Sequence, residues 1–179
     1  MDEQQRPFLA NDALMPEVKI NELLAVPDGD RRSMMLATAE SCTGGGVAAR
    51  ITSIAGSSDY FLGGIVAYSN AAKAKLLGVS HETLDTRGAV SAECAREMAD
   101  GARRTFGVDL AVSTTGIAGP GGATSRKPVG LVYIALATPE GIQSEEFHFS
   151  GSRAVVTSAA TEAALLMLLR GVARLREKG

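Results

Sequence analysis

A serine between an apolar run and a helix-forming segment is the feature that most constrains the fold of this chain. Residues 34–39 form the apolar run, which predicts a short buried strand. Val47, Ile51 and Ile54 then recur at helical spacing. The chain is therefore expected to turn sharply from strand to helix at Ser41, where the N–H groups of a helix start can hold an anion.

The rest of the chain alternates between helix and strand patterns. The expected elements are a short helix around 18–24, a strand at 65–68, a helix at 70–78 with Asn70 as its N-cap, a helix at 91–107 capped by Ser91, a strand at 109–114, a hairpin of strands 129–138 and 142–149, and a helix at 153–175. This order predicts an α/β fold with helices packed on a mixed, mostly parallel sheet and a C-terminal hairpin plus helix. In this class, ligands bind outside the carboxyl ends of the strands.

The length predicts one domain. A chain of 179 residues can bury one good core but is too short for two comfortable domains. Residues 1–12 are polar and contain Pro7, so we expect a loose N-terminal tail. Residues 13–179 would then form the single domain.

Composition narrows the choice of partners. The formal net charge of −2 argues against a nucleic-acid surface and favours a small-molecule partner. Cys42 and Cys94 form no CxxC pair and only two histidines are present, so a structural zinc site is not expected. No basic and apolar signal region opens the chain, and no run approaches the roughly 18 apolar residues of a membrane span. We therefore expect a cytoplasmic location, no membrane contact and free thiols.

Ser41 is the first candidate for chemistry. A serine at a strand-to-helix turn is either a nucleophile or a helix cap. Its activation needs a base, and His81 and His148 lie in unremarkable polar or strand contexts. A Ser-His-Asp triad therefore has weak support, and a lysine is the better candidate for the base.

Lys73 and Tyr68 flank the next predicted strand-to-helix junction, so their polar ends can converge on one pocket. Lys73 must be neutral to accept a proton, which requires burial or a neighbouring positive charge. The alternatives are a solvated helix face for Lys73 and a core ring for Tyr68. Cys42 is a rival nucleophile, but adjacent residues at a helix start point in different directions, and we expect a small buried cysteine there.

Residues 115–127 contain four glycines and Pro120, and therefore form a loop. The segment lacks the Gly-Lys-Ser or Gly-Lys-Thr of a Walker A motif, and Pro120 disfavours a dinucleotide-type helix opening. The loop is either a nest of N–H groups for a phosphate or an oxyanion, or a ligand-free loop of small residues. Glu40 either orients a substrate group or caps the helix that follows it.

Several separated motifs together resemble the CinA carboxy-terminal domain family, the nicotinamide-nucleotide amidohydrolases. The resemblance covers residues 15–175. In the family's order, the motifs are Ala39-Glu40-Ser41-Cys42-Thr43-Gly44-Gly45, Tyr68-Ser69-Asn70 with Lys73, Gly88-Ala89-Val90-Ser91, Thr115-Gly116-Ile117-Ala118-Gly119-Pro120-Gly121-Gly122, and Lys127-Pro128-Val129-Gly130. Near Arg153 the chain departs from the family, with Ser152 where an acidic residue is common and Thr157 where another arginine is common.

The resemblance implies hydrolysis of the carboxamide of nicotinamide mononucleotide to nicotinic acid mononucleotide and ammonia, in pyridine-nucleotide salvage. It implies no metal or organic cofactor. Ser41 would be the nucleophile and Lys73 the general base, with Tyr68 assisting proton transfer. The residues expected to bind the substrate are Glu40, Thr43, Gly44, Gly45, Ser69, Asn70, Thr115, Gly116, Ala118, Gly119 and Arg153.

Two other functions stay open from the sequence. One is a non-catalytic nucleotide-binding or accessory module of the competence/damage-inducible type, and the other is a serine esterase or amidase with another substrate. The apolar stretch from Val155 to Leu169 also predicts a homo-oligomer, because it can bury two sides of a helix.

Overall fold

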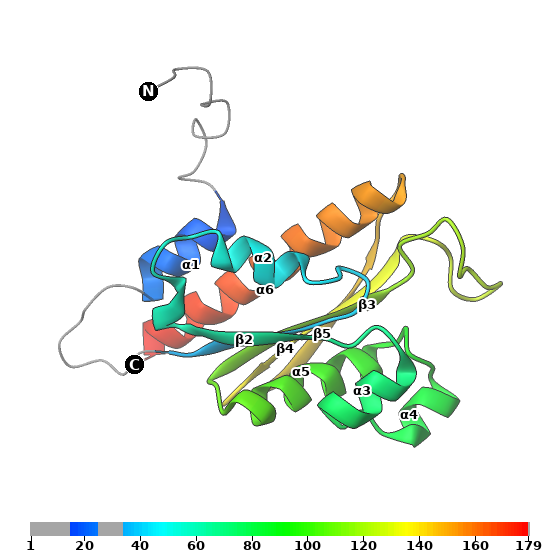
Figure 1. Ribbon diagram of the computed structural model, residues 1–179, viewed down its shortest axis with the longest axis horizontal. Helices are drawn as coiled ribbons and strands as arrows, with labels where there is room; N and C mark the ends of the chain where they lie inside the picture. Colours follow the sequence, from blue (N-terminus) through cyan, green and yellow to red (C-terminus); the bar gives the residue numbers. More distant parts are fainter. Residues whose placement is uncertain (1–14, 25–33, 179) are drawn as a thin grey trace, which may run out of the picture.

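Five strands, β1 (Leu36–Glu40), β2 (Phe61–Val66), β3 (Leu110–Gly116), β4 (Leu131–Thr138) and β5 (Gly141–His148), form one sheet. Their order in the sheet is β2-β1-β3-β4-β5 (Figure 1). The computed structural model describes residues 15–24 and 34–178, so the expected tail at 1–12 lies outside the described residues. β1 pairs in parallel with β2 and β3, whereas β4 pairs antiparallel with β3 and β5. Four strands thus run one way, which confirms the mixed, mostly parallel sheet.

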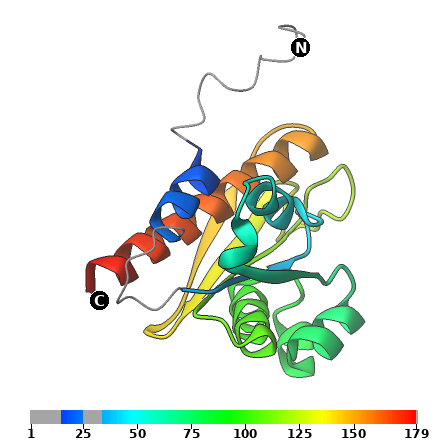
Figure 2. The ribbon, with the colours of Figure 1, turned by 60° about the vertical axis from the view of Figure 1, so that its left-hand side comes forward.

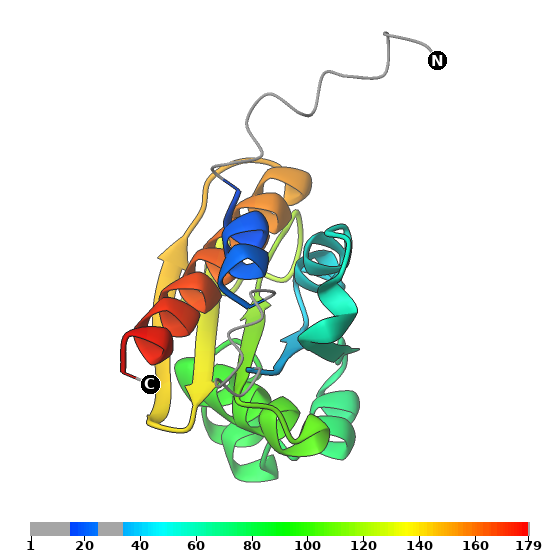
Figure 3. The same cartoon turned by 90° about the vertical axis from the view of Figure 1, so that its left-hand side faces the viewer.

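Helices cover both faces of the sheet (Figures 2 and 3). One face carries α1 (Pro16–Leu24), α2 (Gly46–Thr52) and α6 (Arg153–Lys178), and the other carries α3 (Asn70–Leu77), α4 (His81–Thr86) and α5 (Ala92–Phe106); a short 3-10 turn, η3, spans Ser57–Asp59. Successive strand residues face opposite layers. Leu36 and Leu110 join the core under α6, while Ala37 and Ala111 join the core under α5.

The helix at 18–24, the helix from Ser91, the hairpin and the closing helix are all confirmed, while three boundaries differ. β2 begins at Phe61 and ends at Val66, because it pairs along the whole of β1, from Leu36↔Phe61 to Glu40↔Val66, with a register shift after Leu36. Gly63 and Gly64 interrupt the apolar pattern of β2, so its first residues do not look like a strand in the sequence. β3 extends to Gly116, and Ile54 lies beyond the end of α2.

The N-cap of α3 is Ser69, not Asn70. Ser69 has extended backbone angles, and its hydroxyl accepts a hydrogen bond from the Ala72 N–H at 3.1 Å. Asn70 is already the first helical residue. Serine and asparagine are both good N-caps, so the two adjacent residue types alone do not decide where α3 begins.

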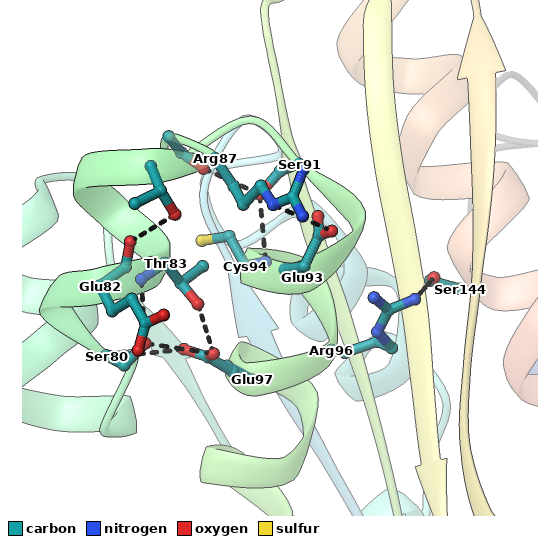
Figure 4. A network of polar contacts seen from close by, with 12 residues as sticks. Ser80, Glu82, Thr83, Arg87, Ser91, Glu93, Cys94, Arg96, Glu97 and Ser144 are labelled. Carbon is teal, nitrogen blue, oxygen red and sulfur yellow. Dashed lines mark hydrogen bonds and ion pairs between the residues drawn. The ribbon is translucent and has the colours of Figure 1, made fainter.

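The helix α4 was not predicted, and it is held against α5 by one carboxylate (Figure 4). Glu97 on α5 accepts hydrogen bonds from the Ser80 N–H at 2.7 Å and the Thr83 hydroxyl at 2.6 Å. Ser80 in turn caps α4 by accepting from the Thr83 N–H. A helix of six residues is stabilised by such tertiary contacts rather than by its own periodicity.

The helix α6 has the length and mean hydropathy of a membrane-spanning helix, contrary to the expectation that no run approaches one. Half of its most apolar window is buried inside the fold. Ala160, Ala164, Leu165 and Leu168 contribute to the core over β3 and β4. The apolar composition of α6 therefore fits a core helix of this domain.

The carboxylate of Glu40 fixes the turn between β1 and α2. It accepts hydrogen bonds from the Thr43 hydroxyl at 2.7 Å and from the N–H groups of Gly45, Val47 and Ala48 at 2.8–3.1 Å. These N–H groups belong to the start of α2, where no helical carbonyl is available to them. Glu40 is 1% exposed, so its position is set by these donors.

A second buried carboxylate ties α1 to the rest of the domain. Glu17 is 4% exposed and accepts two hydrogen bonds from the Arg50 guanidinium of α2, one of them at 2.8 Å from Nε. The same guanidinium also pairs with Glu162 on α6. One arginine thus holds three helices together on one face of the sheet.

We expect Glu40→Gln to lower the free energy of unfolding by about 2 kcal/mol, since the amide places an NH₂ group against N–H donors. Urea denaturation of the purified protein measures the change. Glu177→Gln, at an exposed position of α6, is the matched control. An equal loss in the two variants would contradict this account of Glu40.

Arg50→Leu is expected to cost about 3 kcal/mol of unfolding free energy, because it leaves the carboxylate of Glu17 buried without its cation. The double variant Arg50→Leu/Glu17→Leu should recover much of that loss, since no charge is then left buried. The same denaturation measurement tests both. If the double variant is as unstable as the single one, the buried charge of Glu17 is not the cause.

Candidate active site

The ends of two parallel neighbouring strands bring Ser41 and Lys73 together. Ser41 follows β1 directly, and its N–H donates to the Thr114 carbonyl of β3 at 3.0 Å. Beyond β2, the Ala67 N–H donates to the Glu40 carbonyl at 2.8 Å, which holds the start of the next turn against β1. Gly44 and Gly45, with φ of +63° and +101°, then allow the chain to reverse into α2.

The amine of Lys73 contacts the hydroxyl of Ser41 in a closed environment. The distance from Lys73 Nζ to Ser41 Oγ is 2.9 Å. The same amine lies 2.9 Å from the Ala67 carbonyl oxygen and 3.5 Å from that of Tyr68. Lys73 is 2% exposed and Ser41 8% exposed. This is the separation and the shielding that a lysine base requires.

The surroundings of Lys73 favour its neutral form. Burial lowers the pKa of the Lys73 amine below its ordinary value. The thiols of Cys94 and Cys42, whose negative charge would oppose that shift, have pKa values raised to about 11 by their own burial. A neutral amine can donate its two N–H groups to the two carbonyls and accept the hydroxyl proton of Ser41 with its lone pair.

Cys42 is a small buried residue, as expected. It is 7% exposed, and the pKa of its thiol is too high for a thiolate at neutral pH. Ser41, with an amine beside its hydroxyl, is therefore the better nucleophile of the two.

A cavity of about 230 Å³ opens beside Ser41 and Lys73. Its basic side chains are the Arg153 guanidinium and the Lys73 amine, and no carboxylate of the described residues lines it. An anionic ligand is therefore favoured by charge. Of the predicted site residues, it is lined by Ser41, Tyr68, Asn70, Lys73, Thr115, Gly116, Ala118, Gly119 and Arg153.

Tyr68 lies on the outer wall of this cavity and is 61% exposed. Its hydroxyl accepts a hydrogen bond from Arg153 Nη2 at 2.7 Å. Arg153 also donates from Nη1 to the Gly119 carbonyl at 2.9 Å. The hydroxyl of Tyr68 is thus engaged with α6 and the glycine loop, rather than with Ser41 or Lys73.

Five predicted binding residues do not line the cavity: Glu40, Thr43, Gly44, Gly45 and Ser69. Glu40 takes the second of its two expected roles, that of capping the next helix. The hydroxyl of Thr43 links Glu40 to Thr114 at 2.7 Å on each side. Glu40, Thr43 and Gly45 thus support the turn that carries Ser41, whereas Ser69 caps α3.

Five cavity residues besides Cys42 were not among the predicted site residues. Ala89 and Val90 come from the segment before α5, and the Ala89 carbonyl accepts from the Thr115 hydroxyl at 2.7 Å. In the sequence, both residues belong to the Gly88-Ala89-Val90-Ser91 motif, which contributes to the family resemblance but to no site prediction. The others, in the predicted glycine loop, are Ile117, Gly121 and Gly122.

Within residues 15–24 and 34–178, no group of three or more His, Cys, Asp and Glu side chains could hold a metal ion.

Comparison with known proteins places this chain in a family. The CinA C-terminal domain pattern matches residues 23–172. A CinA-like protein of Citrifermentans bemidjiense is 55% identical over 137 residues, which cover 76% of this chain and 33% of the relative. A CinA-like protein of Syntrophomonas wolfei is 53% identical over 135 residues, 75% of this chain and 32% of the relative. The chain thus spans about a third of the length of these curated relatives.

Solved structures agree with the sequence match. A competence/damage inducible protein from Agrobacterium tumefaciens is 41% identical, with a TM-score of 0.79 over 87% of this chain and 94% of that one. A CinA superfamily protein from Klebsiella pneumoniae is 32% identical, with a TM-score of 0.82 over 89% of this chain and 96% of that one. In sequence and in fold, the chain belongs to the CinA C-terminal domain family.

Proposed function

We propose that this chain hydrolyses the carboxamide of nicotinamide mononucleotide, with Ser41 as nucleophile and Lys73 as general base. The observation that carries the proposal is the 2.9 Å contact between Lys73 Nζ and Ser41 Oγ in a cavity that Arg153 also lines. The choice of substrate rests on the resemblance of the chain to the amidohydrolases. The choice of mechanism rests on the contact, since a buried amine can take the hydroxyl proton of an adjacent serine.

In the first half-reaction, Lys73 accepts the proton of Ser41 while Ser41 Oγ attacks the carboxamide carbon. The tetrahedral intermediate then collapses, and Lys73 returns the proton to the leaving nitrogen, which departs as ammonia. An ester joins the nicotinoyl group to Ser41. In the second half-reaction, Lys73 takes a proton from water, the hydroxide oxygen attacks the ester, and Ser41 regains its proton as the acid leaves.

The oxyanion of the intermediate needs N–H donors, and the turn after Ser41 offers few. Gly44 and Gly46 donate to carbonyls within the turn, and Gly45 donates to Glu40. We therefore assign the oxyanion to the N–H of Cys42, the residue after the nucleophile, and to the loop from Ala118 to Gly122, both of which line the cavity. One such donor is worth about 3 kcal/mol in comparable sites.

Arg153 is the residue that we assign to the phosphate of the nucleotide. Its guanidinium makes two hydrogen bonds, to Gly119 and Tyr68, and no carboxylate among residues 15–24 and 34–178 pairs with it. Three of its five N–H groups stay available for a doubly charged anion. The family's acidic residue before this arginine is Ser152 here, which leaves the cation uncompensated.

The role of Tyr68 in proton transfer stays a prediction.

Purified protein is expected to release ammonia from nicotinamide mononucleotide. Ser41→Ala and Lys73→Met should each lower kcat by about 10³-fold or more, since they remove the nucleophile and its base. Ser158→Ala and Lys75→Met, at exposed positions, are the matched controls. Saturable binding of the nucleotide without ammonia release would favour the non-catalytic nucleotide-binding module instead.

The rate should rise with pH through the pKa of Lys73, because only the neutral amine accepts a proton. Burial lowers that pKa, so the rise should be complete before the pH at which an ordinary lysine titrates. Initial rates of ammonia release from about pH 6 to about pH 10 measure it.

Protein stability gives an independent check of the same pKa. Between the pKa of folded Lys73 and the higher pKa of the unfolded chain, the unfolded state binds more protons, so stability rises with pH. The parent should therefore gain stability relative to Lys73→Met as the pH rises through this window. A constant difference between the two proteins would contradict a lowered pKa.

A further inference from the structure

We infer that the ring of Tyr68 is the surface on which the positively charged pyridinium ring of the substrate stacks. This inference rests on the proposed function, because it needs a nicotinamide nucleotide as the ligand. It gives Tyr68 a binding role that depends on the aromatic face, whereas a role in proton transfer depends on the hydroxyl.

Tyr68 is the only aromatic side chain that lines the cavity within the described residues. The other lining residues are small, aliphatic or hydroxyl-bearing, apart from Asn70, Cys42, Lys73 and Arg153. A flat heteroaromatic ring that enters this cavity therefore meets one surface of matching shape and chemistry.

The position of Tyr68 leaves its ring accessible while its edge is held. The hydroxyl is fixed by Arg153 at 2.7 Å, and Arg153 is fixed by the Gly119 carbonyl at 2.9 Å. With 61% of the residue exposed, most of Tyr68 is open to solvent. A ring anchored at one edge and open to solvent is pre-organised for stacking, since little side-chain freedom is lost when a ligand arrives.

The positive charge of the pyridinium ring strengthens its attraction to the aromatic face of Tyr68. The nitrogen that joins nicotinamide to ribose is quaternary, so the ring carries a positive charge at every pH. No carboxylate of the described residues lines the cavity to balance it, and Lys73 and Arg153 cannot attract it. The negative face of an aromatic ring attracts a cation, which makes Tyr68 the side chain suited to this end of the substrate. Arg153, bonded to the edge of the same tyrosine, suits the phosphate at the other end.

Stacking has a kinetic signature that differs from proton transfer. The pyridinium ring keeps its charge in the substrate, the intermediate and the product, so contact with Tyr68 stabilises all of them alike. Uniform binding of this kind changes KM and leaves kcat alone. Loss of a proton donor or acceptor would lower kcat.

The test compares Tyr68→Phe, which keeps the aromatic face, with Tyr68→Leu, which removes it at similar size. Because both variants lack the hydroxyl and its bond to Arg153, their difference reports the ring. We expect the KM for nicotinamide mononucleotide to be roughly 2- to 30-fold higher in Tyr68→Leu than in Tyr68→Phe, with similar kcat. Equal KM values in the two variants would overturn the inference.

A binding measurement tests the role of charge directly. In a Ser41→Ala background, which prevents turnover, calorimetry compares nicotinamide mononucleotide with its reduced form, which has the same phosphate, ribose and carboxamide but a neutral ring. The charged form should bind more tightly to Ser41→Ala and to Ser41→Ala/Tyr68→Phe. This preference should disappear in Ser41→Ala/Tyr68→Leu. A preference that survives in the leucine variant places the cation elsewhere and rejects the role of Tyr68.

The two proposals fail in distinguishable ways. If the parent releases ammonia and Tyr68→Leu matches Tyr68→Phe in KM and in ring preference, the amidohydrolase proposal stands and stacking is wrong. If the parent neither releases ammonia nor binds the nucleotide, the proposed function fails and stacking falls with it. Thermal melting of each variant checks that it folds. Substitution of an exposed residue such as Tyr68 should not disturb folding.

Discussion

The buried carboxylate of Glu40 is the interaction on which the geometry of this domain depends. A chain that leaves a central strand and enters a helix at once has several N–H groups without carbonyl partners. Glu40 satisfies three of them and the hydroxyl of Thr43 from a single position at the end of β1. The turn can therefore be tight, Ser41 is held beside the end of β2, and α2 begins where it can pack on α6.

Burial of Lys73 shows how stability and reactivity are opposed in the same side chain. An amine that is 2% exposed has lost most of its hydration, and its polar contacts are one hydroxyl and two carbonyls. Such a position disfavours the ammonium form and thereby destabilises the folded state at neutral pH. Because no negative charge stabilises the ammonium form, the amine is more readily neutral and can act as a base. A carboxylate beside Lys73 would stabilise the fold and remove the reactivity.

The sequence predicted helices packed on a mixed sheet because strands and helices were marked by periodicity. It also indicated several of the residues that line the cavity, because glycines and polar residues follow strand ends. It could not decide whether Glu40 orients a substrate group or caps the next helix, since local spacing does not show whether a side chain faces the turn or the cavity. Likewise, Ser69 and Asn70 are both good caps, and only the backbone angles decide between them. The helix α4 escaped prediction because Glu97, distant in sequence, is what stabilises it. The partner of the Tyr68 hydroxyl, Arg153, comes from the other half of the chain and leaves no trace in local spacing.

The direction of β4 has a consequence for how this domain can be altered. Because β4 runs opposite to β1, β2 and β3, the turn between β4 and β5 lies at the end of the sheet away from Ser41. Residues at this turn, such as Glu140 with its ion pairs to Arg174 and Lys178, contact the last part of α6 rather than the cavity. One end of the sheet therefore carries the reactive groups, and the other is a place where insertions, fusions or new chain ends leave the reactive end intact.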